Sequence, residues 1–256
     1  MTRSVALVTG ASSGIGRATA IRLARDFEAV VLVARRRDEL AGAAREIEAL
    51  DAVPLIVEAD LGRTESAEAV VGATLARFGR IDAVLNIAGA VPGIDLFQMT
   101  DDQWEASFAL KFHGARRLTI RAWDALKATG GAVVFTSGTA AVTPQAATAA
   151  IGTINAAIEA MSKAFSERGQ GDGVQVNAVA PGPVLTGRRR GLIEAFAAAK
   201  GLTFEEAQAT LLAKAGLARY GAPEDIAELM AFAVSPASRW MTGTVLRMDG
   251  GEIKSV

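Results

Sequence analysis

The sequence has no cysteine and only one histidine in 256 residues. The lack of cysteine excludes disulfide bonds and thiolate chemistry, and it is typical of proteins from a reducing compartment. One histidine without cysteine also provides too few ligands for the usual nitrogen or sulfur metal site. We therefore expect no metal centre, and we expect a cytoplasmic location.

Neither sign of charge is in excess, and no apolar run is long. Lys and Arg number 27 against 28 for Asp and Glu, so no net field favours nucleic acid or an anionic membrane. No stretch approaches the ~20 apolar residues that span a bilayer. Half of the residues are apolar, which is ample for a buried core. We expect a globular protein that acts on a small molecule, without a nucleic-acid or membrane partner.

A glycine-rich stretch, Thr9-Gly-Ala-Ser-Ser-Gly-Ile-Gly16, follows an apolar run and leads into a helical pattern. Glycine has no Cβ, so Gly10, Gly14 and Gly16 can form a tight turn and let the backbone approach a pyrophosphate. The free N–H groups of the helix that follows then point at the anion. A strand before and a helix after are the context in which such a motif binds a dinucleotide.

Short β-branched runs alternate with longer helical patterns along the chain, as in a parallel sheet covered on both faces. The predicted strands are Val5–Thr9, Ala29–Ala34, Pro54–Glu58, Ala83–Asn86, Ala132–Thr136, Val174–Val179 and Val245–Met248. The predicted helices are Ile15–Phe27, Asp38–Leu50, Glu65–Phe78, Asp101–Ala128, Ala149–Arg168 and Glu224–Ser235. The pattern predicts one doubly wound α/β domain over residues 1–256, with a seven-stranded parallel sheet.

A helical insertion without a strand, residues 187–221, departs from this alternation. Its second helix begins at Thr203-Phe-Glu-Glu206, which has the spacing of a capping box. Because the insertion follows the sixth strand, it should lie over the carboxyl edge of the sheet, where ligands bind. It is either a substrate lid or a pair of additional packing helices.

These motifs together resemble the classical short-chain dehydrogenase/reductase family over nearly the whole chain. The matching segments are Thr9–Gly16, Asp60-Leu61, Asn86-Ile-Ala-Gly89, Asn177-Ala-Val-Ala-Pro-Gly182 with Thr186, Pro223-Glu-Asp-Ile-Ala, Thr242-Gly243 and Asp249-Gly-Gly251. The resemblance implies a Rossmann-type sheet, a bound NAD(P)(H) and a homodimer or homotetramer. It also implies cofactor roles at Gly10, Ser12, Ser13, Gly14, Ile15, Gly16, Asp60, Leu61, Asn86, Ala88, Gly89, Pro181, Gly182, Val184 and Thr186.

The residues after the second strand bear on the choice of cofactor. An acidic residue there would bind a ribose 2′-hydroxyl, but the chain has Ala34 followed by Arg35, Arg36 and Arg37. Guanidinium groups suit a 2′-phosphate, so Arg35 and Arg36 favour NADP(H) over NAD(H). Alternatively they form a solvated basic helix start beside Asp38.

The catalytic tetrad of the resembled family is substituted at all four positions. In that family a tyrosine transfers the proton, a lysine lowers its pKa, a serine orients the carbonyl and an asparagine completes the relay. The corresponding positions here are Ile151, Asn155, Gly138 and Lys111. The only tyrosine of the chain, Tyr220, lies outside this pattern. Asparagine and lysine are thus exchanged between two helices.

Three functions remain open. The protein is an NADP(H)-binding member of the family with weak or absent carbonyl and alcohol activity, an oxidoreductase with a proton relay rebuilt around Lys111, or a catalyst of non-redox chemistry in the same pocket. The pocket walls should include Gly138, Ile151 and Val91 and be largely apolar. Arg188-Arg-Arg190, at the start of the insertion, either meet an acidic substrate or form a solvated face. Lys163 should pair with Glu159, one helical turn before it.

Overall fold

The computed structural model describes residues 4–255, in which seven parallel strands form one sheet in the order β3-β2-β1-β4-β5-β6-β7. The strands are β1 (Val5–Thr9), β2 (Ala29–Ala34), β3 (Val53–Glu58), β4 (Ala83–Asn86), β5 (Ala132–Thr136), β6 (Gln175–Pro181) and β7 (Val245–Met248). The predicted fold class is confirmed. The strand order reverses between β1 and β4, which is the point at which open α/β sheets bind ligands.

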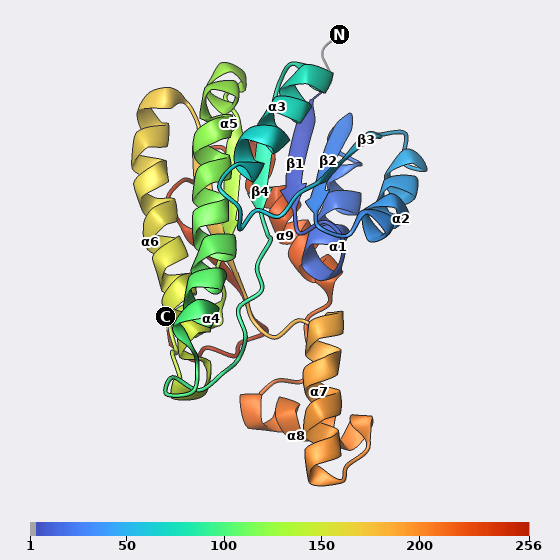
Figure 1. Ribbon diagram of the computed structural model, residues 1–256, viewed down its shortest axis with the longest axis vertical. Coiled ribbons are helices and arrows are strands. Elements are labelled where there is room, and N and C mark those ends of the chain that lie inside the picture. Colours follow the sequence, from blue (N-terminus) through green and yellow to red (C-terminus); the bar gives the residue numbers. More distant parts are fainter. Residues whose placement is uncertain (1–3, 256) are drawn as a thin grey trace.

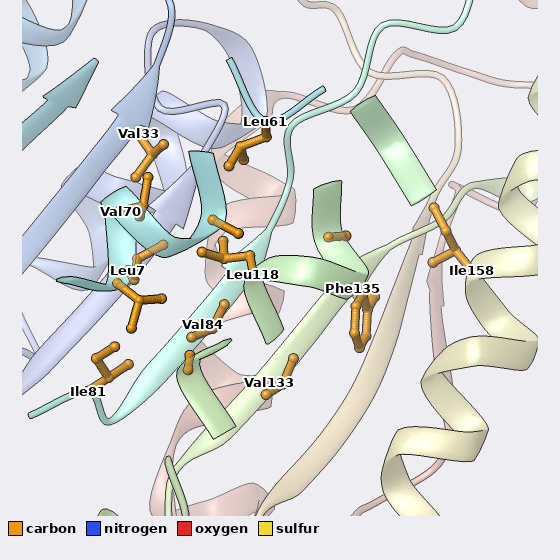
Figure 2. Close-up of a cluster of buried hydrophobic side chains, with 14 of the residues drawn as sticks. Leu7, Val33, Leu61, Val70, Ile81, Val84, Leu118, Val133, Phe135 and Ile158 are labelled. Atoms are coloured by element: carbon orange, nitrogen blue, oxygen red, sulfur yellow. The ribbon is translucent and has the colours of Figure 1, made fainter. Parts of the chain in front are cut away.

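Helices cover both faces of this sheet (Figure 1). One face carries α3 (Ser66–Phe78), α5 (Ala115–Thr129) and α6 (Ala149–Asp172), and the other carries α1 (Gly14–Leu23), α2 (Arg37–Glu48) and α9 (Pro223–Val234). Figure 2 shows the first of these two cores, where Phe135 of β5 and Val84 of β4 meet Leu118 of α5. Each such side chain, once buried, contributes roughly 1.5–3 kcal/mol.

The long helix predicted over residues 101–128 is not a continuous α-helix. The chain forms α4 (Asp101–Ser107), then the π-helical segment η1 (Phe108–Gly114), then α5. Gly114 lies so close to the preceding β3–α3 connection that an added Cβ would come within 2.7 Å of the Leu61 carbonyl oxygen. Helix periodicity alone gave no sign of this change, which places Lys111 inside the π segment.

Two helices follow β6 and extend beyond the carboxyl edge of the sheet (Figure 1). They are α7 (Gly187–Lys200) and α8 (Phe204–Ala215), and they share a small apolar cluster that contains Ile193 and Tyr220. The predicted capping box at Thr203 and Glu206 is present. Short helical turns occur at η2 (Thr139–Ala141), η3 (Ala146–Thr148) and η4 (Pro236–Ser238). Within residues 4–255, no helix has the length and apolar character needed to cross a membrane.

Candidate active site

Two adjoining cavities lie at the carboxyl edge of the sheet. The first cavity, of about 370 Å³, is lined by the glycine-rich loop and the ends of β2 and β4. The second cavity, of about 460 Å³, is lined by the ends of β5 and β6, the start of α6 and the start of α7. Ile15, Gly89, Thr136, Thr186 and Arg188 border both. A ligand in the first cavity can therefore reach a ligand in the second.

The glycine-rich loop forms a cradle that only glycine permits. Gly10 and Gly14 have φ values of +68° and +54°, in the left-handed region. A Cβ at Gly16 would lie 2.2 Å from the carbonyl oxygen of Gly10. Ser13 precedes the first turn of α1, and its side chain makes no capping hydrogen bond there. The N–H groups at this helix start suit an anion such as a pyrophosphate.

The far end of the first cavity is basic. Arg35 and Arg36 line it, and both are exposed. The Arg36 guanidinium donates to the Ser12 and Ser13 hydroxyls over 3.3 Å and forms an ion pair with Glu39 at 2.7 Å. Asp60, the one acidic residue lining this cavity, accepts from the backbone N–H of Gly62 at 3.0 Å. The residues present therefore fit a dinucleotide with an additional phosphate.

The structure brings most of the expected cofactor residues to these cavities. The first cavity is lined by Gly10, Ser12, Ser13, Gly14, Ile15, Gly16, Arg35, Arg36, Asp60, Leu61, Ala88, Gly89 and Thr186. Pro181, Gly182 and Val184 line the second cavity instead. The side chain of Asn86 lines neither, because its amide donates to Thr119 on α5 at 3.0 Å. Its role in binding the cofactor stays a prediction, because this side chain contacts Thr119 and neither cavity.

All four substituted tetrad positions line the second cavity: Lys111, Gly138, Ile151 and Asn155. Lys111 reaches from the π segment to α6, where its Nζ donates to Asn155 Oδ1, and it also lies 3.4 Å from the Ser137 carbonyl oxygen. Asn155 is buried, and a Cβ at position 138 would lie 2.8 Å from its Nδ2. The asparagine thus occupies the space that a serine side chain at position 138 would need.

The ammonium group of Lys111 is destabilised by its surroundings. Burial and, to a smaller extent, the positive charge of Arg188 together lower the pKa of Lys111 from 10.5 to about 8. The side chain still has part of its surface open to the cavity. A group with a pKa near neutrality exists in both protonation states at working pH, as a general acid or base requires.

The walls of the second cavity are more polar than we expected from the sequence. Val91 and Ile151 line it, but so do Arg188, Arg189 and Glu252, whose carboxylate accepts from the Thr139 hydroxyl at 2.7 Å. Glu252 belongs to the segment after β7, and no sequence motif connected that segment to the pocket. The charged composition overturns the expectation of largely apolar walls.

The predicted pair between Lys163 and Glu159 does not form. The Glu159 carboxylate instead accepts from the Ser137 hydroxyl at 2.8 Å, and Lys163 lies 3.4 Å from the Gly243 carbonyl oxygen. Ser137 directly precedes Gly138, so this hydroxyl is committed to α6 and not to the cavity centre. Sequence spacing on one helix could not show that β5 competes for the same carboxylate.

Comparisons with known proteins decide the family. A family model described as enoyl-(acyl carrier protein) reductase matches residues 10–252. The chain belongs to the short-chain dehydrogenase/reductase family. A curated member, A-factor type gamma-butyrolactone 1'-reductase (1S-forming) of Streptomyces virginiae, is 33% identical over 257 residues, covering 98% of this chain and 96% of its own.

Solved structures superpose on nearly the whole chain. L-sorbose reductase from Gluconobacter frateurii, complexed with NADPH and L-sorbose, has a TM-score of 0.95 at 28% identity, covering 100% of this chain and 98% of its own. Actinorhodin polyketide ketoreductase with NADPH has a TM-score of 0.91 at 27% identity, covering 97% of both chains. Both neighbours are therefore NADPH complexes.

Proposed function

We propose that this member of the family binds NADP(H) in the first cavity and that its ordinary carbonyl and alcohol activity is weak or absent. The glycine cradle, the two arginines and the NADPH-bound neighbours support the cofactor. When bound, the nicotinamide supplies or accepts a hydride, so the chain's own residues must supply the proton and polarise the carbonyl.

The lack of a phenol at the second cavity carries this proposal. Tyr220 is the only tyrosine in the sequence, and it is buried among α7 and α8 without lining that cavity. The pKa of Tyr220 is raised by burial, so its hydroxyl is a still weaker acid there. Losing one positioned acid–base group commonly slows a reaction by 10²–10⁴-fold.

The position of Lys111 favours a second candidate, an oxidoreductase with a rebuilt proton relay. Lys111 lines the cavity, and its pKa of about 8 allows it to give a proton to the oxygen of a reduced carbonyl and regain one from solvent. Asn155 would act as a positioning residue, because it holds this nitrogen through Oδ1.

Turnover of NADPH with a panel of ketones and aldehydes separates the two candidates. The variant is Lys111→Met, which keeps most of the side-chain length without the charge, and the control is Lys200→Met at the far end of α7. We expect NADPH binding in all three proteins and little turnover in any. Robust turnover that is lost only in Lys111→Met would establish the relay, and failure of the wild type to bind NADPH would refute both candidates.

Cofactor preference is tested by titrating NADPH and NADH separately. Charge-assisted contacts to phosphate contribute roughly 1.5–3 kcal/mol each, so NADPH should bind at least tenfold more tightly. Replacing Arg35 and Arg36 together by alanine should remove most of this preference. The matched control is Arg37→Ala, because Arg37 does not line the first cavity. Equal affinities in the wild type would contradict the assignment.

A further inference from the structure

We infer that the second cavity binds an organic anion, namely a small carboxylate that carries an oxo or hydroxyl group, and that Arg188 and Arg189 hold its carboxylate. This inference rests on the proposed function, because the ligand would lie beside the bound nicotinamide. It adds the chemical class of the ligand, and it chooses the acidic-ligand alternative that the sequence left open for Arg188-Arg-Arg190.

The charges that line the second cavity do not balance. Lys111, Arg188 and Arg189 are positive, and Glu252 is the one carboxylate among the lining residues. Between residues 4 and 255, no ion pair joins any of the three cations to an Asp or Glu side chain. A bound anion would supply the missing negative charge.

The two arginines are fixed by neutral groups. An Arg188 Nη donates to the Val91 carbonyl oxygen, and the Arg189 guanidinium lies 5.8 Å from the centre of the Tyr220 ring. Arginines elsewhere in the protein are anchored differently: Arg219, for example, meets the Asp225 carboxylate at 2.7 Å. Neutral anchors hold the guanidinium fork in place and leave its charge for a ligand, with the planar geometry that carboxylates match.

The cations of this cavity also act on one another. Arg188 contributes to the lowered pKa of Lys111, and Arg189 contributes to the lowered pKa of Arg188, with burial the larger cause in both cases. These like charges lie close together, and all three side chains line the second cavity. An anion placed in that space would relieve this repulsion and raise the pKa of Lys111.

The start of α7 and the carboxylate of Glu252 fix the orientation of the ligand. The positive end of the α7 dipole favours an anion at its first turn, where both arginines lie. Glu252, held by Thr139, would repel a carboxylate and accept a hydrogen bond from a hydroxyl. The ligand's carboxylate therefore points to α7, and a hydroxyl group, where the ligand carries one, points to the segment after β7. A volume of about 460 Å³ suits a small organic molecule.

A cofactor phosphate is the competing partner for one of these arginines. Arg188 borders both cavities, whereas Arg189 borders only the second. Arg189 therefore reports on the anion of the second cavity independently of the cofactor. Arg190 is the matched control, because it follows directly on the same helix, stacks over Phe204 at 5.9 Å and lines neither cavity.

The test measures binding to the NADPH-loaded protein by calorimetry, so it does not depend on turnover. The probes are 2-oxobutanoate, 2-oxohexanoate and 2-oxooctanoate. Each is paired with the neutral diketone in which a methyl group replaces the charged carboxylate oxygen, such as heptane-2,3-dione for 2-oxohexanoate. We expect at least one acid to bind tenfold or more tightly than its diketone. Arg189→Gln should reduce this preference to about threefold or less, and Arg190→Gln should leave it unchanged.

NADPH affinity and thermal unfolding of each variant complete the experiment. Arg189→Gln should bind NADPH as the wild type does. A weaker NADPH affinity in Arg188→Gln would show that a cofactor phosphate uses that side chain. NADPH binding without any acid preference would overturn this inference and leave the proposed function intact. A preference that survives Arg189→Gln would also overturn it. Failure to bind NADPH would refute the proposed function and, with it, this assignment.

Discussion

Replacing Lys111 by methionine should stabilise the protein at neutral pH, and the gain should fade as the pH rises. The pKa of Lys111 is about 8 in the folded protein, against an ordinary value of 10.5. Below pH 8 Lys111 is protonated in both the folded and the unfolded protein, so burial of its charge lowers the free energy of unfolding by the full amount. The difference between these two pKa values corresponds to about 3 kcal/mol of lost stability. Loss of the hydrogen bond from the charged group to Asn155 offsets about 1.5–3 kcal/mol of that, so the net gain at pH 7 is at most about 1.5 kcal/mol.

The direction of the pH dependence follows from proton binding. Between pH 8 and 10.5 the unfolded wild type binds more protons at Lys111 than the folded wild type does, so wild-type stability rises with pH in this window. Lys111→Met lacks this group. The stability difference between the two proteins should therefore shrink by roughly 2–3 kcal/mol between pH 7 and pH 10.

Equilibrium urea unfolding at pH 7, 8.5 and 10 measures this difference, and all other titrating groups cancel between the two proteins. A second variant, Arg188→Gln, keeps Lys111 and removes one cause of its lowered pKa. The pH range in which stability depends on Lys111 should therefore become narrower. A difference between wild type and Lys111→Met that stays constant with pH would refute the buried-charge reasoning. A methionine variant less stable than the wild type at every pH would refute it as well.

Three further outcomes follow from the structure. Gly16→Ala should abolish NADPH binding and lower the melting temperature, because its Cβ would lie 2.2 Å from the Gly10 carbonyl oxygen; an unchanged dissociation constant would contradict the cradle. Gly138→Ser alone should produce no carbonyl reduction and should destabilise the fold by about 1–3 kcal/mol, because Asn155 fills the space that the serine side chain needs. The fourfold change Gly138→Ser, Ile151→Tyr, Asn155→Lys and Lys111→Asn should create NADPH-dependent carbonyl reduction, measured in a spectrophotometric assay. Sedimentation should show a dimer or tetramer paired through residues 101–128 and 149–168, and a monomer at all concentrations would contradict this arrangement.

The sheet was predictable because its signals are local. Five of the seven strands begin and end at the predicted residues, and β3 and β6 differ by one or two at their ends. Buried parallel strands are short apolar runs between turns, so each can be recognised without knowledge of its neighbours. The glycine cradle was predictable for the same reason, since its geometry depends on residues within one loop.

The side-chain partners in the second cavity were not predictable from local pattern. Glu159 is one turn from Lys163 on α6, but its carboxylate accepts from Ser137 on β5. Glu252 meets Thr139 across 113 positions of sequence. Such pairings depend on how distant elements converge, and helical spacing describes only neighbours on one element.

The π-helical segment before α5 means that this stretch contains one residue more than an α-helix would need. A π turn closes over five residues instead of four, and each α-helical residue advances by about 100°. Everything after Gly114, including the core-facing Leu118, is thereby rotated relative to Lys111. A deletion of one residue within 108–114 would restore a regular helix, and it would then direct either the lysine to the cavity or the leucine to the core, but not both. The additional residue therefore allows Lys111 to face the second cavity while Leu118 faces the core.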